Sequence, residues 1–212
     1  MATFSFTEVL RRRIGANFST FSRAEISNDQ LNHAAVAIVI DKHLEDERAT
    51  VLLTRRSQHI NRHKGQFALP GGRLNKDETV NEAALRELKE ELGVELAPGA
   101  LLGTLDDYAT RSGFNITPVV FWGGGALQAK PDPNEVAQVF RIPVEELDSP
   151  DIPQFTQQVD GDHPVLYFPH LPTLGDSVYA PTAAILYQFR EVALRGNNTR
   201  VAHYDQPRFA WK

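Results

Sequence analysis

Short apolar runs separated by charged or Gly- and Pro-containing segments make up most of the chain, a pattern that predicts strands of ordinary length. The two strongest runs, residues 33–40 and 50–54, flank a charged loop and are typical of paired strands. The first run stops at Asp41, well short of the roughly 18 apolar residues that a membrane-spanning helix needs. Further strands are expected at 100–105, 114–122 and 135–142, with two shorter ones around Phe155 and Tyr167.

Residues 80–92 show the period of an amphipathic helix. Thr79 and Glu82 form a capping box at its start, and Gly93 is a natural C-cap at its end. One helical turn is expected at 143–147.

A last helix is expected to begin at Pro181 and to stop at Gly196, with Ile185, Phe189 and Val192 on one face. Strands therefore outnumber helices, but both are needed to cover the apolar surface. The sequence predicts a mixed α/β fold.

The chain has 212 residues, of which 42% are hydrophobic, so it can bury a sizeable core. No repeat or low-complexity linker divides it. We expect a helical extension at residues 1–30 packed on one domain at 31–212. In the extension, Thr7 should cap a short helix that passes through Leu10 and ends at Gly15.

Charge and cysteine content exclude several classes of protein. A net charge of −5 argues against nucleic acid as the main partner, because such binders usually carry a basic surface. The absence of cysteine excludes disulfides and thiolate chemistry and makes the cytoplasm the expected location. Organellar targeting by the Arg- and Ser-rich residues 1–23 is left open. No membrane partner is expected, and a homodimer is left open.

The helix at 80–92 crowds carboxylates toward its C-terminal end, where the helix dipole disfavours negative charge. Its core-facing arc is expected to contain Ala84, Leu85, Leu88 and Leu92. Glu87, Glu90 and Glu91 cluster on the neighbouring arc, at a cost of about 0.2–0.5 kcal/mol per like-charge pair. Taken alone, such a pattern is usually a solvated acidic face.

The residues before the helix favour a binding site instead. Gly71 and Gly72 allow a tight turn that could approach a phosphate or offer a carbonyl to a metal. Glu78 lies eight residues before Arg86 and is a plausible ion-pair partner for it. Carboxylates on a rigid helix suit the hard cations Mg²⁺ and Mn²⁺.

Nine positions resemble the Nudix box, G-x5-E-x7-R-E-U-x-E-E-x-G-U, in which U is apolar. The matching residues are Gly72, Glu78, Arg86, Glu87, Leu88, Glu90, Glu91, Gly93 and Val94. The resemblance implies an α/β/α sandwich with a mixed sheet, and hydrolysis of a nucleoside diphosphate linked to another moiety. It also implies divalent cations held by Glu87, Glu90 and Glu91, with Glu78 and Arg86 as a structural pair.

Residues 52–72, LLTRRSQHINRHKGQFALPGG, resemble the second signature of the coenzyme A pyrophosphatase branch, and similarity to this branch extends over about 32–147. Leu69 replaces an expected Phe, which puts local packing in doubt. Residues 179–186 are similar to the closing helix of the branch, with Ala180 where Gly is usual. The resemblance implies cleavage of coenzyme A or its derivatives to 3′,5′-ADP and 4′-phosphopantetheine.

The loop before the box gathers six basic groups, Arg55, Arg56, His59, Arg62, His63 and Lys64. They suit a substrate with a phosphate beyond the scissile pyrophosphate, although a loop this short cannot aim all six at one anion. A solvated basic loop, with His63 as a turn residue, is the alternative. Phe67 fits a core position better than a base-stacking one.

The proposed chemistry uses a metal ion to offset charge on the pyrophosphate and to activate water. Glu90 and Glu135 are the two candidates for the base. Other nucleotide substrates stay open, namely ADP-ribose, a dinucleotide or a nucleoside triphosphate, as does a nucleotide-sensing module without turnover.

Overall fold

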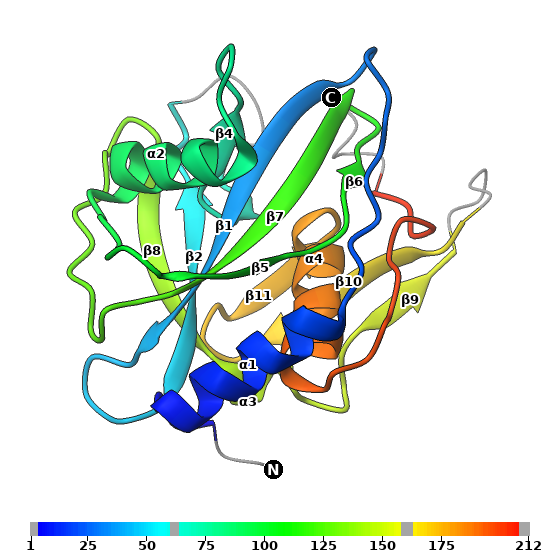
Figure 1. Cartoon of the computed structure of the whole chain (residues 1–212). Coiled ribbons are helices and arrows are strands. Elements are labelled where there is room, and N and C mark those ends of the chain that lie inside the picture. The colour runs from blue at the N-terminus through cyan, green and yellow to red at the C-terminus, as the bar shows by residue number, and fades with distance from the viewer. Residues whose placement is uncertain (1–3, 60–63, 158–162, 208–212) are drawn as a thin grey trace.

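The computed structural model describes residues 4–59, 64–157 and 163–207 (Figure 1). The helices are α1 (Glu8–Thr20), α2 (Val80–Leu92), α3 (Val144–Leu147), α4 (Thr182–Phe189) and the π-helical η1 (Arg190–Leu194). The strands are β1 (Asn32–Lys42), β2 (Ala49–Arg56), β3 (Phe67–Ala68), β4 (Gly71–Arg73), β5 (Leu101–Thr104), β6 (Tyr108–Ala109), β7 (Phe114–Trp122), β8 (Val136–Pro143), β9 (Gln154–Thr156), β10 (Val165–Leu171) and β11 (Asp176–Tyr179). No helix in these ranges has the length and apolar character needed to span a membrane.

A mixed sheet forms the centre of the fold, and within the described ranges it has eight strands. Its main path runs β3-β2-β1-β7-β5, with β4 on β1, β6 on β7 and β8 on β2. The long β1–β7 pair is parallel, whereas β1 pairs antiparallel with both β2 and β4. A second sheet, β11-β10-β9, is antiparallel. The expected mixed α/β fold is confirmed.

Alternation along β1 sends its side chains into two separate cores. Ala35, Ala37 and Val39 face α2, while Ile38 and Ile40 face the core shared with α1, α4 and the small sheet. In Figure 1, α2 lies over one face of the sheet and α4 over the other. The central sheet is therefore a layer between helices. The loops at the ends of its strands are not covered by this packing and can contribute residues to a site.

The structure confirms the predicted strands to within two residues at each end, and β1 and β2 pair as expected. The short strands β4, β6 and β11 are additional. They have two to four residues each, too few for an alternating pattern to be recognised in the sequence.

The prediction that Gly15 ends the first helix is wrong, because α1 continues to Thr20. Thr7 does cap it, accepting a hydrogen bond from the Leu10 amide. A glycine inside a helix costs about 0.5–1 kcal/mol, and burial of Ile14 and Phe18 along the continued helix offsets that cost. The last helix begins after Pro181 as predicted, but its final turns are π-helical.

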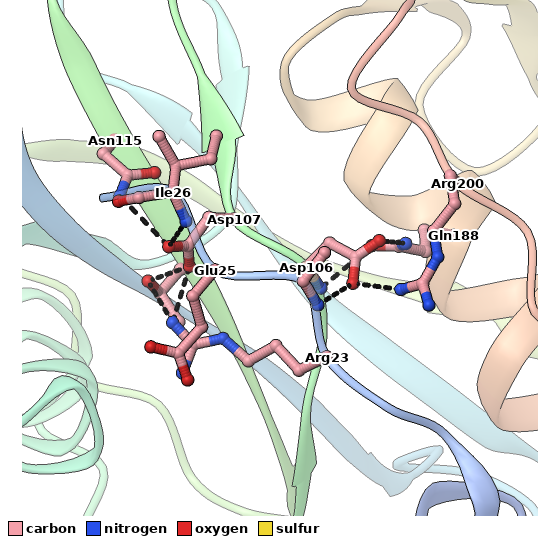
Figure 2. A network of polar contacts seen from close by, with 10 residues as sticks. Arg23, Glu25, Ile26, Asp106, Asp107, Asn115, Gln188 and Arg200 are labelled. Atoms are coloured by element: carbon pink, nitrogen blue, oxygen red, sulfur yellow. Dashed lines mark hydrogen bonds and ion pairs between the residues drawn. The ribbon is translucent and has the colours of Figure 1, made fainter. Parts of the chain in front are cut away.

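Two neighbouring buried carboxylates fasten both ends of the chain to the sheet (Figure 2). Asp107 accepts hydrogen bonds from Arg23 at 2.6 Å and from the Ile26 amide at 3.0 Å. Asp106 accepts from Gln188 at 2.7 Å and pairs with Arg200. Despite burial, the hydrogen bonds that Asp107 accepts hold its pKa below the usual range. Residues before β1 and residues of the C-terminal part of the chain are thus both held to the segment between β5 and β6 by charge-assisted bonds.

Candidate functional site

Helix α2 begins and ends where its local sequence predicts. Glu82 donates its amide to the Thr79 hydroxyl at 3.3 Å, and its carboxylate accepts from the Thr79 amide at 2.9 Å. At the other end, Gly93 adopts the left-handed conformation with φ of 63°. The helix is therefore fixed at both ends independently of its tertiary contacts.

The rotation of α2 about its axis differs from the prediction. Leu85, expected in the core, is 37% exposed, whereas Glu91 is 3% exposed. Ala83, Ala84, Leu88, Glu91 and Leu92 form the buried face. At about 100° per residue, Glu91 lies near the middle of this face, with Glu87 toward its edge and Glu90 on the solvent side.

Two glycines of β4 bring the backbone against these carboxylates. A Cβ atom on Gly72 would lie 2.3 Å from Oε1 of Glu87, so a side chain at this position is incompatible with the observed carboxylate. A Cβ atom on Gly71 would lie 2.3 Å from the Ala35 carbonyl oxygen. The Gly71 amide is also close enough to Glu91 to act against the rise in the pKa of that carboxyl. Gly72 is therefore needed for β4 and α2 to meet this closely, and Gly71 for β4 and β1 to do so.

Arg86 binds three acidic side chains and one strand carbonyl. Its Nε and Nη2 donate to the two carboxylate oxygens of Glu78 at 2.8 and 3.0 Å, a bidentate pair that lowers the pKa of Glu78. Nη1 donates to Glu87 at 2.7 Å and to Glu90 at 3.0 Å. Nη2 also donates to the Arg73 carbonyl at 2.9 Å. Arg86 thus holds helix, strand and loop in one arrangement.

Burial dominates the electrostatics of the inner carboxylates. It raises the pKa of Glu91 to about 8, and the negative charges of Glu87 and Glu135 add to this effect. Arg56 opposes it, with its Nη1 4.0 Å from Oε1 of Glu91. Burial likewise raises the pKa of Glu87, against the hydrogen bond from Arg86. Ionised Glu91 therefore calls for more positive charge than Arg56 provides.

Glu135 comes from a distant part of the chain. It precedes β8, is exposed, and accepts a hydrogen bond through its carbonyl from the Ser57 amide at 2.8 Å. Its carboxylate is close enough to Glu87 and Glu91 to raise the pKa of both. The structure therefore brings Glu135 to the same region as the α2 carboxylates.

The donor set fits a hard divalent cation, because it consists of carboxylates partly withdrawn from water. Across the described residues, however, no three His, Cys, Asp or Glu side chains converge as they stand into a set that could hold a metal ion. Glu87 and Glu90 are turned toward Arg86 instead. A cation that bound here would compete with this guanidinium.

The structure separates the predicted basic residues. Arg56 faces Glu91, whereas Arg55 is exposed, donates to the Gly65 carbonyl at 3.2 Å and lies over the Phe67 ring. His59 and Lys64 are exposed. Arg62 and His63 lie outside the described residues. Of the predicted basic-loop side chains that the structure describes, Arg56 is therefore the one that reaches the α2 carboxylates.

A cavity of about 390 Å³ lies beside the site, with Arg56, Gly71 and Gly72 in its wall. Most of its lining is apolar, and includes Val36, Phe67, Leu69, Phe114, Ile116 and Ile185. Phe67 packs edge-on against Phe140 and is half-buried, so it contributes both to the core and to this wall. The volume is in the range of small-molecule sites.

Residues far along the chain complete the cavity. Thr182 and Gln206 line it, and Thr182 donates to the Phe67 carbonyl at 3.2 Å. Gln206 accepts a 2.7 Å hydrogen bond from the Arg111 amide, and Asp205 forms a two-point ion pair with the Arg111 side chain at 2.8 and 3.0 Å. Sequence reasoning missed these wall residues, because no motif marks them. The similarity at 179–186 was the available signal for the region around Thr182.

The site thus combines a mixed sheet, an acidic helix laid over a glycine-containing strand, and a cavity alongside. The NUDIX domain model matches residues 31–161, and the chain belongs to the Nudix hydrolase family. Members of this family generally use divalent metal ions.

Relatives include an uncharacterized Nudix hydrolase, NudL, from Pectobacterium atrosepticum, 39% identical over 118 residues. The match covers 55% of this chain and 60% of NudL. Nudix hydrolase 3 of Caenorhabditis elegans is 36% identical over 124 residues, covering 57% of this chain and 52% of the relative. The chain thus spans little more than half the length of these two relatives.

Among solved structures, a MutT protein from Methanosarcina mazei is 24% identical with a TM-score of 0.43, over 60% of this chain and 83% of that one. The Nudix domain of NrtR from Shewanella oneidensis, solved with ADP-ribose, is 23% identical with a TM-score of 0.44. It covers 57% of this chain and 77% of that one.

Proposed function

We propose that the protein is a metal-dependent pyrophosphohydrolase of coenzyme A or its derivatives, producing 3′,5′-ADP and 4′-phosphopantetheine. The observation that carries the proposal is the approach of Glu87 and Glu91 to Gly71 and Gly72 at the edge of an apolar cavity. Carboxylates for a cation, and a cavity for an organic group, are what a nucleoside diphosphate derivative requires.

The choice of coenzyme A rests on the segment before the box. In LLTRRS, Leu52 and Leu53 are buried on opposite sides of the sheet. Their burial fixes which face of β2 each later residue of the strand points to. Arg56 then lies beside Glu91, and the Ser57 hydroxyl accepts from the His59 amide at 3.2 Å, shaping the start of the basic loop. These contacts support a substrate-binding role for the signature beside the cavity.

Glu87, Glu90 and Glu91, with the Gly71 carbonyl, would hold Mg²⁺ or Mn²⁺. When bound, the cation supplies charge stabilisation for the pyrophosphate and acidifies a water molecule. Arg86 keeps Glu87 and Glu90 in place through its bonds to both, and its bidentate pair with Glu78 fixes the guanidinium itself.

Around the reacting atoms, Arg56 donates to a phosphate oxygen, and Gly72 allows the substrate to approach the strand. Glu90 or Glu135 takes the proton of the attacking water. The oxygen of that water adds to one phosphorus, and the bridging P–O bond breaks. Arg55 and Lys64 add positive charge around the substrate outside this centre, and Arg62 and His63, outside the described residues, stay predicted substrate-binding residues.

Product identification by mass spectrometry tests the proposal. The panel comprises coenzyme A, acetyl-coenzyme A, ADP-ribose, a dinucleotide and a nucleoside triphosphate, each with Mg²⁺, with Mn²⁺ and with chelator. Release of 3′,5′-ADP and 4′-phosphopantetheine, requiring metal and lost in Glu91→Gln, supports it.

Faster release of AMP or inorganic pyrophosphate from another substrate would replace coenzyme A by that substrate. Tight binding without turnover of any panel member would indicate the nucleotide-sensing alternative. Either outcome contradicts the proposed activity.

A further inference from the structure

Arg73 is the last residue of β4 and follows directly after Gly72. Its backbone pairs with Ala34 of β1, and its carbonyl accepts the 2.9 Å hydrogen bond from Arg86. The guanidinium that organises the box carboxylates therefore also fixes the backbone from which the Arg73 side chain extends. No motif in the sequence marks this residue for function.

The Arg73 side chain extends across β1 toward β7. Its guanidinium carbon lies 5.0 Å from the centre of the Phe114 ring. Ala34 pairs with Arg73 on one side and with Ile116 of β7 on the other, and its small side chain leaves room for the crossing. All four residues line the cavity, so the exposed Arg73 side chain lies at the cavity wall.

Arg73 differs from its neighbours in how its charge is balanced. Arg56, the other cation in the cavity wall, has Glu91 at 4.0 Å, and Arg86 has Glu78, Glu87 and Glu90. No carboxylate of the described ranges lies within ion-pair distance of Arg73. Its charge is thus available to an anion that enters the cavity.

The wall around Arg73 suits a flat, largely apolar group. Phe67 and Phe114 contribute aromatic rings to the lining, and Ser112 contributes a hydroxyl group, whereas the Thr110 hydroxyl is bonded to the Phe114 backbone. An anion next to a flat ring is what distinguishes one half of coenzyme A. The adenosine half joins a purine to an extra phosphate, whereas the pantetheine half carries no charge beyond the scissile pyrophosphate.

We propose, resting on the proposed function, that the cavity takes the adenosine half of the substrate and that Arg73 binds its 3′-phosphate. A contact of guanidinium with a ring face is weak at an exposed site, and a charge-assisted bond to phosphate is stronger. The Arg73 guanidinium can therefore leave the Phe114 ring and bind the phosphate instead. This assignment moves 3′-phosphate recognition from the basic loop to the strand that carries the box glycines.

Calorimetric titration of the metal-free protein tests the assignment without using catalysis. The ligands are 3′,5′-ADP, AMP and 4′-phosphopantetheine. The unmodified protein should bind 3′,5′-ADP about ten- to a hundredfold more tightly than AMP, the range expected for one charge-assisted bond. In Arg73→Gln this preference should fall to less than about threefold, with little change in AMP affinity.

Two control variants separate recognition from general charge effects. Lys76→Gln removes one positive charge from the exposed turn three residues away, outside the cavity wall, and should keep the full preference. Arg73→Lys keeps the charge but loses the planar guanidinium, and should keep part of the preference for 3′,5′-ADP over AMP. Circular dichroism checks that each variant is folded.

Hydrolysis gives an independent test. The ratio of kcat/KM for coenzyme A to that for dephospho-coenzyme A should fall in Arg73→Gln through a change in KM. Hydrolysis of both substrates at equal rates by the unmodified enzyme would overturn the role of Arg73 and leave the proposed activity standing. Hydrolysis of neither would overturn the proposed activity itself. The assignment would also be refuted if Arg73→Gln lost affinity for 3′,5′-ADP and for AMP equally. It would be refuted as well if 4′-phosphopantetheine displaced 3′,5′-ADP, because the two ligands would then occupy the same place.

Discussion

Replacing Glu91 by glutamine should make the metal-free protein more stable while abolishing catalysis. Glu91 is 3% exposed in the buried face of α2, and burial raises its pKa from 4.5 to about 8. The folded state therefore binds a proton that the unfolded chain releases between these two values. Below pH 4.5 the Glu91 carboxyl is protonated in both states and does not lower the free energy of unfolding. As pH rises from 4.5 toward 8, its ionisation in the unfolded chain lowers that free energy.

The size of the effect follows from the two pKa values, since each pH unit between them costs about 1.4 kcal/mol. By this measure the Glu91 carboxyl costs the fold about 1 kcal/mol at pH 5 and about 3 kcal/mol at pH 7. Glutamine is neutral at both, so the variant should gain about 2 kcal/mol on the unmodified protein between pH 5 and pH 7. At about 2–4 °C per kcal/mol for a chain of this size, the difference in Tm should widen by about 4–8 °C.

Thermal unfolding in chelator at pH 5 and pH 7 measures this difference. Glu90→Gln is the matched control, because it makes the same change on the same helix at a side chain that is 58% exposed. The difference in Tm between Glu90→Gln and the unmodified protein should be nearly the same at pH 5 and pH 7. Turnover of Glu91→Gln with Mg²⁺ should fall by several orders of magnitude, since a metal ligand is lost. An equal Tm difference at both pH values would refute the burial argument, and near-normal turnover would refute the ligand assignment.

Three further predictions concern the site and the first helix. Gly72→Ala should lower kcat by about a hundredfold, because its Cβ meets Glu87 at 2.3 Å and the carboxylate must move; circular dichroism should stay unchanged, and near-normal kcat would contradict the role given to the Glu87 position. Gly15→Ala should stabilise the fold by about 0.5–1 kcal/mol in denaturant unfolding, since no described atom beyond the chain neighbours and the backbone of α1 lies within 4 Å of the added Cβ; lower stability would contradict the packing of α1. At saturating metal, amide substitution of the true base, Glu90 or Glu135, should remove the acidic limb of the pH–rate profile. If excess Mn²⁺ rescues both variants, neither is the base.

Local sequence signals were sufficient where the structure depends on contacts within one segment. The capping box of Thr79 and Glu82 and the C-cap at Gly93 predicted α2 at its observed ends, because each cap is formed by neighbouring residues. Alternation in the apolar runs predicted the long strands for the same reason. The Nudix box also identified the glutamates and glycines as members of one motif, whereas the close approach of Gly72 to Glu87 is seen only in the structure.

Tertiary packing decided the rotation of α2 and the walls of the cavity. Periodicity placed Leu85 in the core and the glutamates outside it. In the structure, the face of α2 that packs against β1 and β4 is centred on Glu91. Likewise, Thr182 and Gln206 reach the cavity through long-range contacts that no local pattern encodes. The sequence determined which groups the site contains, because chemistry belongs to residue types. The fold alone determined which of those groups are buried and charged, because burial depends on what packs against them.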